Sequence, residues 1–586
     1  MHVATMNSRR TNKAGEQRVY QSHLLRRTYR DGGKVKHQTL ANLSALPDEV
    51  IDVIRQSLKG EVLVPADVAG VGVLRSLPHG DVAAVMAQAK ALGVPALLGP
   101  AGRQRDLALA LIVSRVVRPA TKLSTVGWWR DTTLGVDLDV AGASTDEVYA
   151  AMDWLLSRQD AIETKLARRH LGDETTNPHR MALFDLSSSW MEGRQCPLAA
   201  RGYSRDGKKG KLQIEYGLLA DPAGRPVAVR VFEGNTGDPT AFVEAVTTVR
   251  DTFKLRHMVM VGDRGMITNA RIDALKQLPA EQGWAWLTCL RATDIAKLAA
   301  DGGPLQMSLF DQHDLVEITH PDYPDERLVA CRNPALADER ARKRQDLLAA
   351  TEALLAPILS AVAAGRLHGA DQIGLKVGKV IGKYKMAKHF TVTITDTSLA
   401  ITRNQAGIGA EAALDGIYVI RTSVPADTLE AADVVVAYKN LSHVERAWRN
   451  IKVDDLSLRP IHHRLEDRVK AHILICMLAE YLVWHLRRAL APLTFTDEQP
   501  PNRANPVAPV QRSDSAARKA SRKRDEHDQP CHSFRGLLAH LATLTRNDLR
   551  YGTDDNAPVV PTLAAPTPTQ RRAFELLGSP VPVTLT

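Results

Sequence analysis

The chain of 586 residues is too long for one ordinary domain, and its 44% hydrophobic content is enough to bury at least one large core. The 76 Lys and Arg against 66 Asp and Glu give a net charge of +10, which is compatible with a polyanionic partner without requiring one. Five widely spaced cysteines form no C-x-x-C pair, and no stretch of about 18 apolar residues lacks charge. These features exclude a disulfide framework and a cysteine-rich zinc site, and they predict a cytoplasmic protein without a signal peptide or a membrane partner.

The first 60 residues are expected to hold a basic β-hairpin followed by a helix. Residues 18–44 read as two strands joined at Asp31-Gly32-Gly33, a sequence typical of a hairpin turn. From about residue 47 to 172 the apolar spacing becomes helical, with breaks at Pro119 and near Gly135. The pattern predicts that residues 61–172 form an all-helical region.

A mixed α/β order begins after this region. Three strands, a helix, a strand, a second helix and a strand are predicted between residues 173 and 292. A charged helix and strand-like runs such as "HFTVTITD" then interrupt the order, which indicates an insertion at residues 293–415 that is largely β. Residues 416–491 would return to the core, and residues 492–586 read as a basic, proline-rich linker and tail with one short helix, "FRGLLAHLATL".

Two aspartates are expected at one edge of the predicted sheet. Asp185 closes the apolar strand "MALFD", and Asp263 closes "VMVGD". Taken singly, each fits a helix cap or a buried ion pair. Together with Glu445, which lies on a helix able to pack on that sheet, they form a set of three acids suited to hard divalent cations such as Mg²⁺. Such a set points to phosphoryl transfer on a polyanion, with two ions about 3.5 to 4 Å apart.

The segment "VVVAYKNLSHVERAWRNIKVDD", residues 434–455, is predicted to be one helix. Tyr438, Glu445 and Lys452 recur at intervals of seven residues, close to two turns, so their side chains would share one face. Glu445 could then reach metal while Tyr438 and Lys452 contact phosphates on either side. The alternative is a surface stripe in which Glu445 pairs with Arg449 one turn later.

These residues resemble a known family. "FDLSSSW" (184–190), "VGDRGM" (261–266) and the Y-x2-L-x3-E-x6-K pattern from Tyr438 to Lys452 are similar, in order and context, to DDE-class insertion-sequence transposases whose last motif is Y-x2-R-x3-E-x6-K. The stretches "FEGNTGD", "GGKVKHQTLANL" and "RPATKLS" also resemble that group, so the similarity spans about residues 17–550.

The resemblance implies an α/β, ribonuclease-H-like mixed-sheet core with an insertion between the second Asp and the Glu. It assigns Asp185, Asp263 and Glu445 as the catalytic, metal-binding triad, holding two Mg²⁺ ions for which Mn²⁺ can substitute. Tyr438 and Lys452 would contact the backbone of the transposon end. This chain departs from the family at Leu441, which stands where the family has Arg; Lys439 or Arg449 could supply the missing charge.

Several other groups are weaker candidates. The basic loop "GYSRDGKKGK" (202–211) places Arg205, Lys208 and Lys209 where DNA would cross the site, although such loops are as often simply solvated. The run at 512–524 could bind DNA without sequence preference or keep a tail soluble. Trp284 and Trp286 are expected to serve packing rather than base stacking, and His462 and His463 to be structural.

The expected activity is that of a transposase. A metal-activated water would cut at the element's ends, and the freed 3'-hydroxyl would join target DNA in the same site. The expected partners are double-stranded DNA, both the terminal inverted repeats and the target, and a second copy of the chain in a synaptic complex. The expected location is the bacterial cytoplasm, on the nucleoid. Two alternatives stay open: a ribonuclease-H-like nuclease without strand transfer, and a transposase-derived DNA-binding protein with a dead site.

Overall fold

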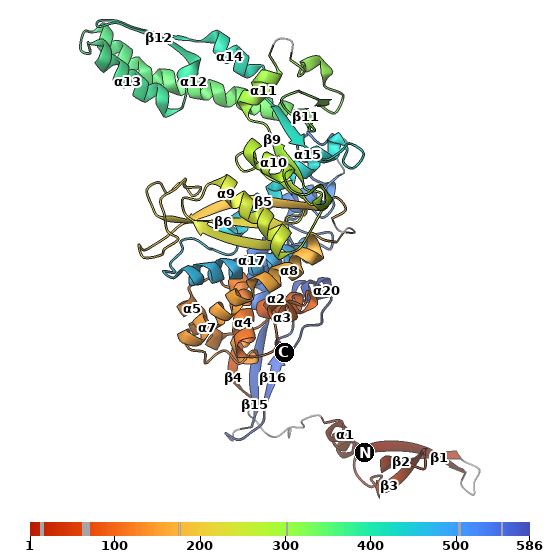
Figure 1. Cartoon of the computed structure of the whole chain (residues 1–586). Coiled ribbons are helices and arrows are strands. Elements are labelled where there is room, and N and C mark those ends of the chain that lie inside the picture. The colour runs from red at the N-terminus through yellow and green to blue at the C-terminus, as the bar shows by residue number, and fades with distance from the viewer. Residues whose placement is uncertain are drawn as a thin grey trace. The chain divides into compact units, whose positions relative to one another are not determined.

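The chain is divided into two compact units in the computed structural model, one made of residues 1–76 and 546–564, the other of residues 77–545 and 565–586. The structure describes residues 1–11, 17–60, 71–173, 175, 177–300, 303–501, 505–552 and 555–585. Figure 1 shows the elements in chain order. The first unit holds the N-terminal strands, and the second holds the large mixed sheet.

The first unit contains two small antiparallel sheets. In one, β2 and β3 form the predicted hairpin, with Asp31 opposite Lys34 across two glycines of positive φ, and β1 adds a strand where the sequence suggested only a polar leader. The other sheet has the order β16-β15-β4. The strand β4 corrects the prediction of an all-helical region, because its pairing partner lies almost at the other end of the chain and leaves no local signal. The elements of this unit are β1 His2–Thr11, β2 Gln17–Asp31, β3 Lys34–Asn42, α1 Asp48–Leu58, β4 Val71–Pro78, β15 Thr545–Tyr551 and β16 Val559–Leu563.

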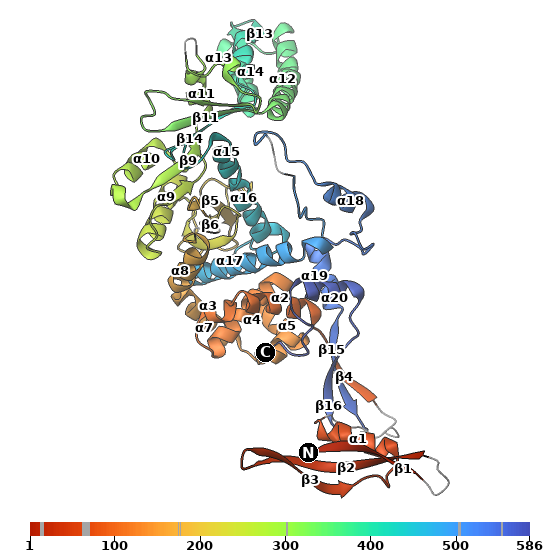
Figure 2. The same cartoon turned by 90° about the vertical axis from the view of Figure 1, so that its right-hand side faces the viewer.

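The predicted helices after residue 79 are confirmed as a helical layer in the second unit. The long apolar helix α17 (Glu466–Ala489) packs against α4 and α7 of this layer and against β7 of the sheet. It therefore lies between the helical layer and the sheet (Figure 2). The helices of the layer are α2 Gly80–Ala91, α3 Val94–Leu98, α4 Arg103–Val117, α5 Lys122–Trp128, α6 Thr133–Asp137, α7 Thr145–Ser157 and α8 Gln159–His170.

The central sheet has eight strands in the order β10-β11-β14-β9-β8-β5-β6-β7. The strands β5, β6 and β7 are antiparallel neighbours, whereas β8 and β9 run parallel to β5. This arrangement of the five strands β5 to β9 is ribonuclease-H-like, as expected, and α9, α15 and α16 contact it. Its elements are β5 Met181–Trp190, β6 Gln213–Ala220, β7 Pro226–Glu233, α9 Asp238–Thr247, β8 Val259–Val261, α10 Asn269–Lys276, β9 Ala285–Cys289, α15 Ala431–Lys439 and α16 Leu441–Arg449.

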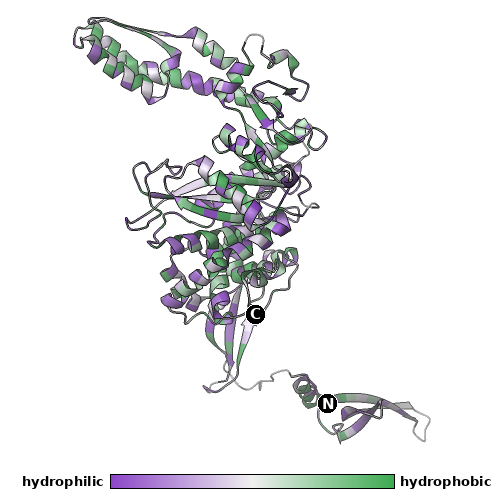
Figure 3. Cartoon of the chain, viewed as in Figure 1, coloured by the Kyte–Doolittle hydropathy of each residue, from purple (hydrophilic) through white to green (hydrophobic). Residues whose placement is uncertain are grey.

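The insertion is more helical than the sequence suggested. Its strands β10 and β11, together with β14, extend the central sheet, and only the short hairpin β12–β13 stands apart from that sheet. The expectation of a largely β insertion is therefore wrong: α12 alone spans 30 residues. Hydrophilic residues gather in the first half of α12 and apolar residues in its second half, which packs with α13 around a small core of its own (Figure 3). The elements here are α11 Ala292–Leu298, β10 Leu315–Ile318, β11 Arg327–Arg332, α12 Pro334–Ala363, α13 Ala370–Lys383, β12 Phe390–Ile394, β13 Leu399–Arg403, α14 Gln405–Ala412 and β14 Ile417–Thr422.

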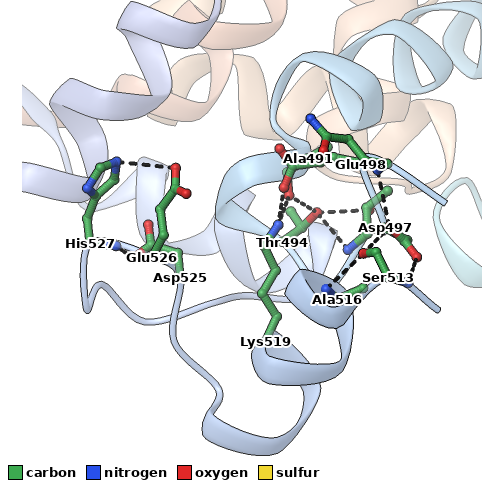
Figure 4. Close-up of polar contacts among 12 residues, drawn as sticks. Ala491, Thr494, Asp497, Glu498, Ser513, Ala516, Lys519, Asp525, Glu526 and His527 are labelled. Carbon is green, nitrogen blue, oxygen red and sulfur yellow. Dashed lines mark hydrogen bonds and ion pairs between the residues drawn. The ribbon is translucent and has the colours of Figure 1, made fainter. Parts of the chain in front are cut away.

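The basic C-terminal run is ordered where a solvated linker was expected. Lys519, on α18 (Asp514–Arg522), is buried, pairs with Glu498 and donates to the carbonyl of Ala491 at 3.1 Å (Figure 4). Asp497 accepts from the backbone and the hydroxyl of Ser513, the N-cap of the same helix. A lysine buried in these contacts is not available to bind DNA. The predicted short helix is confirmed as α19 (Phe534–Ala542), and α20 (Pro568–Leu576) follows.

Two of the described helices, α12 and α17, are long and apolar enough to cross a membrane by length and composition alone. Of the most apolar window of each helix, 83% is buried inside the protein in α17 and 22% in α12. The burial of α17 follows from its place between the sheet and the helical layer.

Candidate active site

Asp185 and Asp263 lie at the same level on neighbouring parallel strands. Leu183 on β5 is paired with Val261 on β8, and each aspartate stands two residues beyond that pair. Neighbouring strands are about 4.8 Å apart, so the two residues sit side by side at the carboxyl end of the parallel pairing. Asp185 is in the middle of β5 rather than at its end, because β5 continues to Trp190 along β6. The parallel neighbour β8, in contrast, ends at Val261.

Asp263 shapes the loop that follows β8. Its Oδ1 accepts the backbone N–H groups of Gly265 and Met266, both at 2.9 Å, while the residue itself stays exposed. These bonds fix the carboxylate through Oδ1. A fourth acid adjoins it: Asp238 Oδ2 and Asp263 Oδ1 lie 3.4 and 3.3 Å from the point that a Cβ on Gly265 would occupy.

Glu445 is presented by α16, which packs on β5. The apolar side of α16 buries Val444, Ala447 and Trp448, and the Trp448 ring lies 4.8 Å from that of Tyr216 on β6. Glu445 itself is exposed, and among the ion pairs of the described residues none joins it to Arg449. The surface stripe that the sequence allowed is therefore not formed.

The three acids interact electrostatically. The pKa of Asp185 is raised to about 7, first by burial and then by the negative charges of Asp263 and Glu445, whereas its own N–H neighbour Leu186 and the Arg205 guanidinium act in the opposite direction. A carboxylate close to two others is in a region of negative electrostatic potential, which a bound cation would neutralise. The structure thus brings the predicted triad to one edge of the sheet.

The donor set suits a hard divalent cation, because three carboxylates offer only oxygen ligands. As they stand, however, no three His, Cys, Asp or Glu side chains in the described ranges converge closely enough to hold an ion. The oxygen ligands of the triad suit a divalent metal. The three carboxylates would have to approach one another to bind it.

Tyr438 lies on α15 rather than on the helix of Glu445. The predicted single helix is interrupted: α15 ends at Lys439, α16 begins at Leu441, and residues Asn450–Asp454 form a π-helical turn. The Tyr438 hydroxyl is paired with the Cys289 thiol at the end of β9, and burial beside that thiol and Asp263 raises the pKa of the tyrosine. Tyr438 therefore still faces the acid edge of the sheet, although it does so from a separate helix.

Lys452, in the π-helical turn, also faces the sheet, but it is buried. Its ammonium lies 2.6 Å from Asp206 Oδ1 and donates to Ser187 Oγ at 3.2 Å, and Arg459 joins the same carboxylate at 2.5 Å. Ser187 is two residues beyond Asp185 on β5 and points to the same face. Lys452 thus borders the acid site from within the protein rather than from a surface open to DNA.

The remaining residues of this segment are dispersed. Lys439 donates to the carbonyls of Pro506 and Val507 at 2.5 and 3.0 Å, which ties α15 to the C-terminal segment. Arg449 is exposed at the end of α16. Leu441 is buried at 9% exposure, so the position that is Arg in the family motif is here part of the packing.

The basic loop divides into buried and exposed residues. Arg205 is held between Glu215 at 3.2 Å and Asp238, beside the acid edge of the sheet. Lys208 and Lys209 are exposed, and the Lys208 ammonium lies 5.5 Å from the centre of the Trp190 ring. The sequence did not point to three of the acids here: Glu215 and Asp238, which hold Arg205, and Asp206, which holds Lys452 and Arg459. Asp206 sits within the basic loop itself, and its charge is the only local signal that could have marked it.

The other candidates serve the structure. Trp286 is buried, and its Nε1 donates to Glu326 Oε2 at 3.1 Å, which confirms a packing role. His463 stacks edge to face on His472 at 5.1 Å, and both line a cavity beside the helical layer.

Two family models match parts of the chain. Residues 8–63 match the family model described as the IS1634 family transposase, N-terminal domain, and residues 191–482 match the transposase DDE domain. Among solved structures, a piggyBac transposase synaptic complex with hairpin DNA aligns over 79% of this chain and 76% of its own, with 9% identity and a TM-score of 0.31. No curated protein matches the chain.

Proposed function

The chain belongs to the DDE transposases of insertion sequences, and we propose that Asp185, Asp263 and Glu445 form its catalytic, metal-binding triad. The observation that carries this assignment is the level placement of the two aspartates on parallel strands, with Glu445 acting on Asp185 from the facing helix. The family uses divalent metal. We infer two Mg²⁺ ions, for which Mn²⁺ can substitute.

When bound, the cations supply an activated water and neutralise charge on the scissile phosphate. The residues of the chain then hold the reacting strand over Asp185, in the middle of β5, and over the carboxyl end of β8. Tyr438 and the exposed Lys208, Lys209 and Arg449 are the side chains that can reach its backbone, with Lys439 and Arg205 set behind them. The first cut frees a 3'-hydroxyl, which attacks a target phosphodiester in a second displacement at the same site.

Two ends cut in concert require at least two copies of the site. We therefore propose that the chain acts as a homodimer on double-stranded DNA, with both inverted repeats held in one synaptic assembly, in the cytoplasm on the bacterial nucleoid. The N-terminal strands β1 to β3 supply a basic sheet suited to end recognition.

The test is cleavage and joining of labelled duplexes that carry the element's own ends. The wild type is expected to cut and join in Mg²⁺ and to do neither in a chelator. Glu445→Gln, which keeps the shape and removes the charge, should bind the ends normally and lose at least about 100-fold in both reactions. Glu339→Gln, an exposed change on α12, is the matched control and should behave as the wild type.

The outcomes separate the alternatives. Full activity of Glu445→Gln would remove that residue from the site. Cleavage without joining by the wild type would make the protein a ribonuclease-H-like nuclease. End binding without cleavage in either metal would make it a DNA-binding descendant of a transposase.

A further inference from the structure

A second site lies beside the helical layer, in a cavity of about 420 Å³ between α5, α7, α17 and the segment 457–463. Its walls are strongly basic: Arg115, Lys122, Arg459 and three histidines line it, and no Asp or Glu is among the lining residues that the structure describes. The catalytic triad does not involve it, whereas residues 119–123 of its wall belong to the stretch "RPATKLS", which resembles the transposase family.

Two of its basic side chains are buried, and no acid among the residues that the structure describes forms an ion pair with either. Arg115 is 6% exposed and donates to the carbonyls of Leu456 at 3.2 Å and Ala120 at 3.0 Å. Lys122 is 7% exposed, and its Nζ lies 3.1 Å from Nδ1 of the equally buried His472. A buried charge without a counterion is costly, so a fold that keeps two of them around one cavity is prepared for an anion.

The surrounding groups respond as they would to an excess of positive charge. Burial and then the Arg115 charge lower the pKa of Lys122 to about 7, and burial followed by Lys122 and Arg115 lowers the pKa of His463 to about 3. The pKa of His472 falls for the same reasons. An anion in the cavity would reverse the charge effects and hold Lys122 protonated.

The cavity is connected to the acid site by direct contacts. Arg459, on its wall, shares Asp206 with Lys452, and Lys452 donates to Ser187, two residues along β5 from Asp185. The cavity wall and the acid site are therefore joined by one chain of side-chain contacts. Arg459 and Lys452 are already paired with Asp206. Lys122 and Arg115 are therefore the side chains available to bind a phosphate.

We propose that this cavity, through Lys122 and Arg115, binds a backbone phosphate of the DNA end that occupies the active site. The proposal rests on the transposase function and adds a contact outside the catalytic triad. It commits to a phosphodiester of DNA; free inorganic phosphate offers the same chemistry and is separated by the test.

The test replaces end-duplex phosphates one at a time by neutral methylphosphonates and measures binding. For the wild type, one or two adjacent positions should weaken binding by about 10- to 100-fold. Lys122→Met should be weakened overall, should show a salt slope lower by about one, and should be insensitive at those same positions only. Lys165→Met, an exposed lysine on α8, is the control and should keep the wild-type pattern.

Two further measurements keep the result interpretable if Lys122→Met folds poorly. Lys122→Arg retains the charge and should restore the sensitive positions. In the unmodified protein, acylation of Lys122, followed by mass spectrometry, should be blocked by the end duplex and not by inorganic phosphate at the same ionic strength.

Each outcome decides something. If no position depends on Lys122, or if Lys122 reacts equally fast with DNA bound, the proposal is wrong. Protection by inorganic phosphate but not by DNA would assign the cavity to a free anion and also overturn it. Cleavage of the same duplex is measured in parallel. A phosphate position that depends on Lys122, without cleavage, would support this contact and contradict the catalytic proposal. Cleavage without such a position would support the catalytic proposal and contradict this contact.

Discussion

Lys452 Nζ lies 2.6 Å from Asp206 Oδ1, and the Asp206 side chain is 1% exposed. The last basic residue of the family motif is thus locked into a buried ion pair, with Arg459 as the second cation on the same carboxylate. The pair joins the π-helical turn after α16 to the loop after β5, so it fixes the helix of Glu445 against the strand of Asp185.

Asp206→Asn is expected to destabilise the protein by about 3 to 5 kcal/mol, because the buried Lys452 and the half-buried Arg459 lose their counterion. Thermal unfolding measures the effect. Glu192→Gln removes the exposed Glu192–Lys211 pair, which involves the same loop, and should leave the melting temperature nearly unchanged. Equal losses in the two variants would contradict the structural role of Asp206.

Lys208 and Lys209 are expected to act on DNA, and Arg205 on stability. The double change of Lys208 and Lys209 to Gln should leave the melting temperature unchanged and lower the salt slope of end binding by about two. Arg205→Gln leaves the buried Glu215 without its cation and should cost about 3 to 5 kcal/mol in unfolding free energy. A salt slope that Lys208 and Lys209 do not affect would show that the loop is simply solvated.

Tyr438→Phe tests whether the hydroxyl contacts DNA or only Cys289. Loss of a single hydrogen bond to a thiol should change the unfolding free energy by about 1 kcal/mol or less. If the hydroxyl also positions the DNA backbone, the cleavage rate should fall while binding of Mg²⁺-free enzyme to the ends changes little. Cys289→Ala is the control, because it removes the thiol partner and keeps the hydroxyl. Identical cleavage by Tyr438→Phe and the wild type would exclude a role in the reaction.

Glu480, on α17, is expected to make stability fall as the pH rises. The side chain is buried, and burial, together with the charge of Asp455, raises its pKa from an ordinary 4.5 to about 8, against the hydrogen bond from Asn450 and the charge of Arg487. Between these two values the native state binds one proton that the unfolded state has released, so the stability declines by at most about 1.4 kcal/mol per pH unit. Glu480→Gln keeps an acceptor for Asn450 and removes the titration.

The variant should therefore melt higher than the wild type at about pH 8 and differ little from it near the ordinary pKa. Melting temperatures across this range check the expectation, with Glu339→Gln as a control that should follow the wild type. A constant difference between Glu480→Gln and the wild type at every pH would mean that Glu480 is ionised in the native state.

The sequence predicted the acid site better than its surroundings. Asp185 and Asp263 could be found because each follows a short apolar run, and a carboxylate in that place is a clear local pattern. The break at Asn440 between α15 and α16 and the π-helical turn after α16 could not be predicted, since both depend on packing against the sheet rather than on residue type. The burial of Lys452 was also invisible, because its partner Asp206 lies far away in the chain inside a loop that reads as basic.

The same reasoning explains the errors in the fold. β4 and β15 are paired across almost the whole chain, and neither has a strand pattern strong enough to stand alone. The insertion was given too much β structure because its strand runs are conspicuous, whereas α12 and α13 bury only narrow apolar stripes against each other. Long-range pairing and shared cores are properties of the folded chain, and short windows of sequence carry little of either.

The chain leaves the core after β9 and returns along β14, which is hydrogen-bonded to β9 with Ile420 opposite Cys289. The beginning and the end of the insertion are thus neighbours in one sheet, as the two sides of a hairpin are. Material can be added or lost between them without any shift in the strands of Asp185 and Asp263. The insertion can therefore change in length and sequence while the strands that carry Asp185 and Asp263 keep their structure.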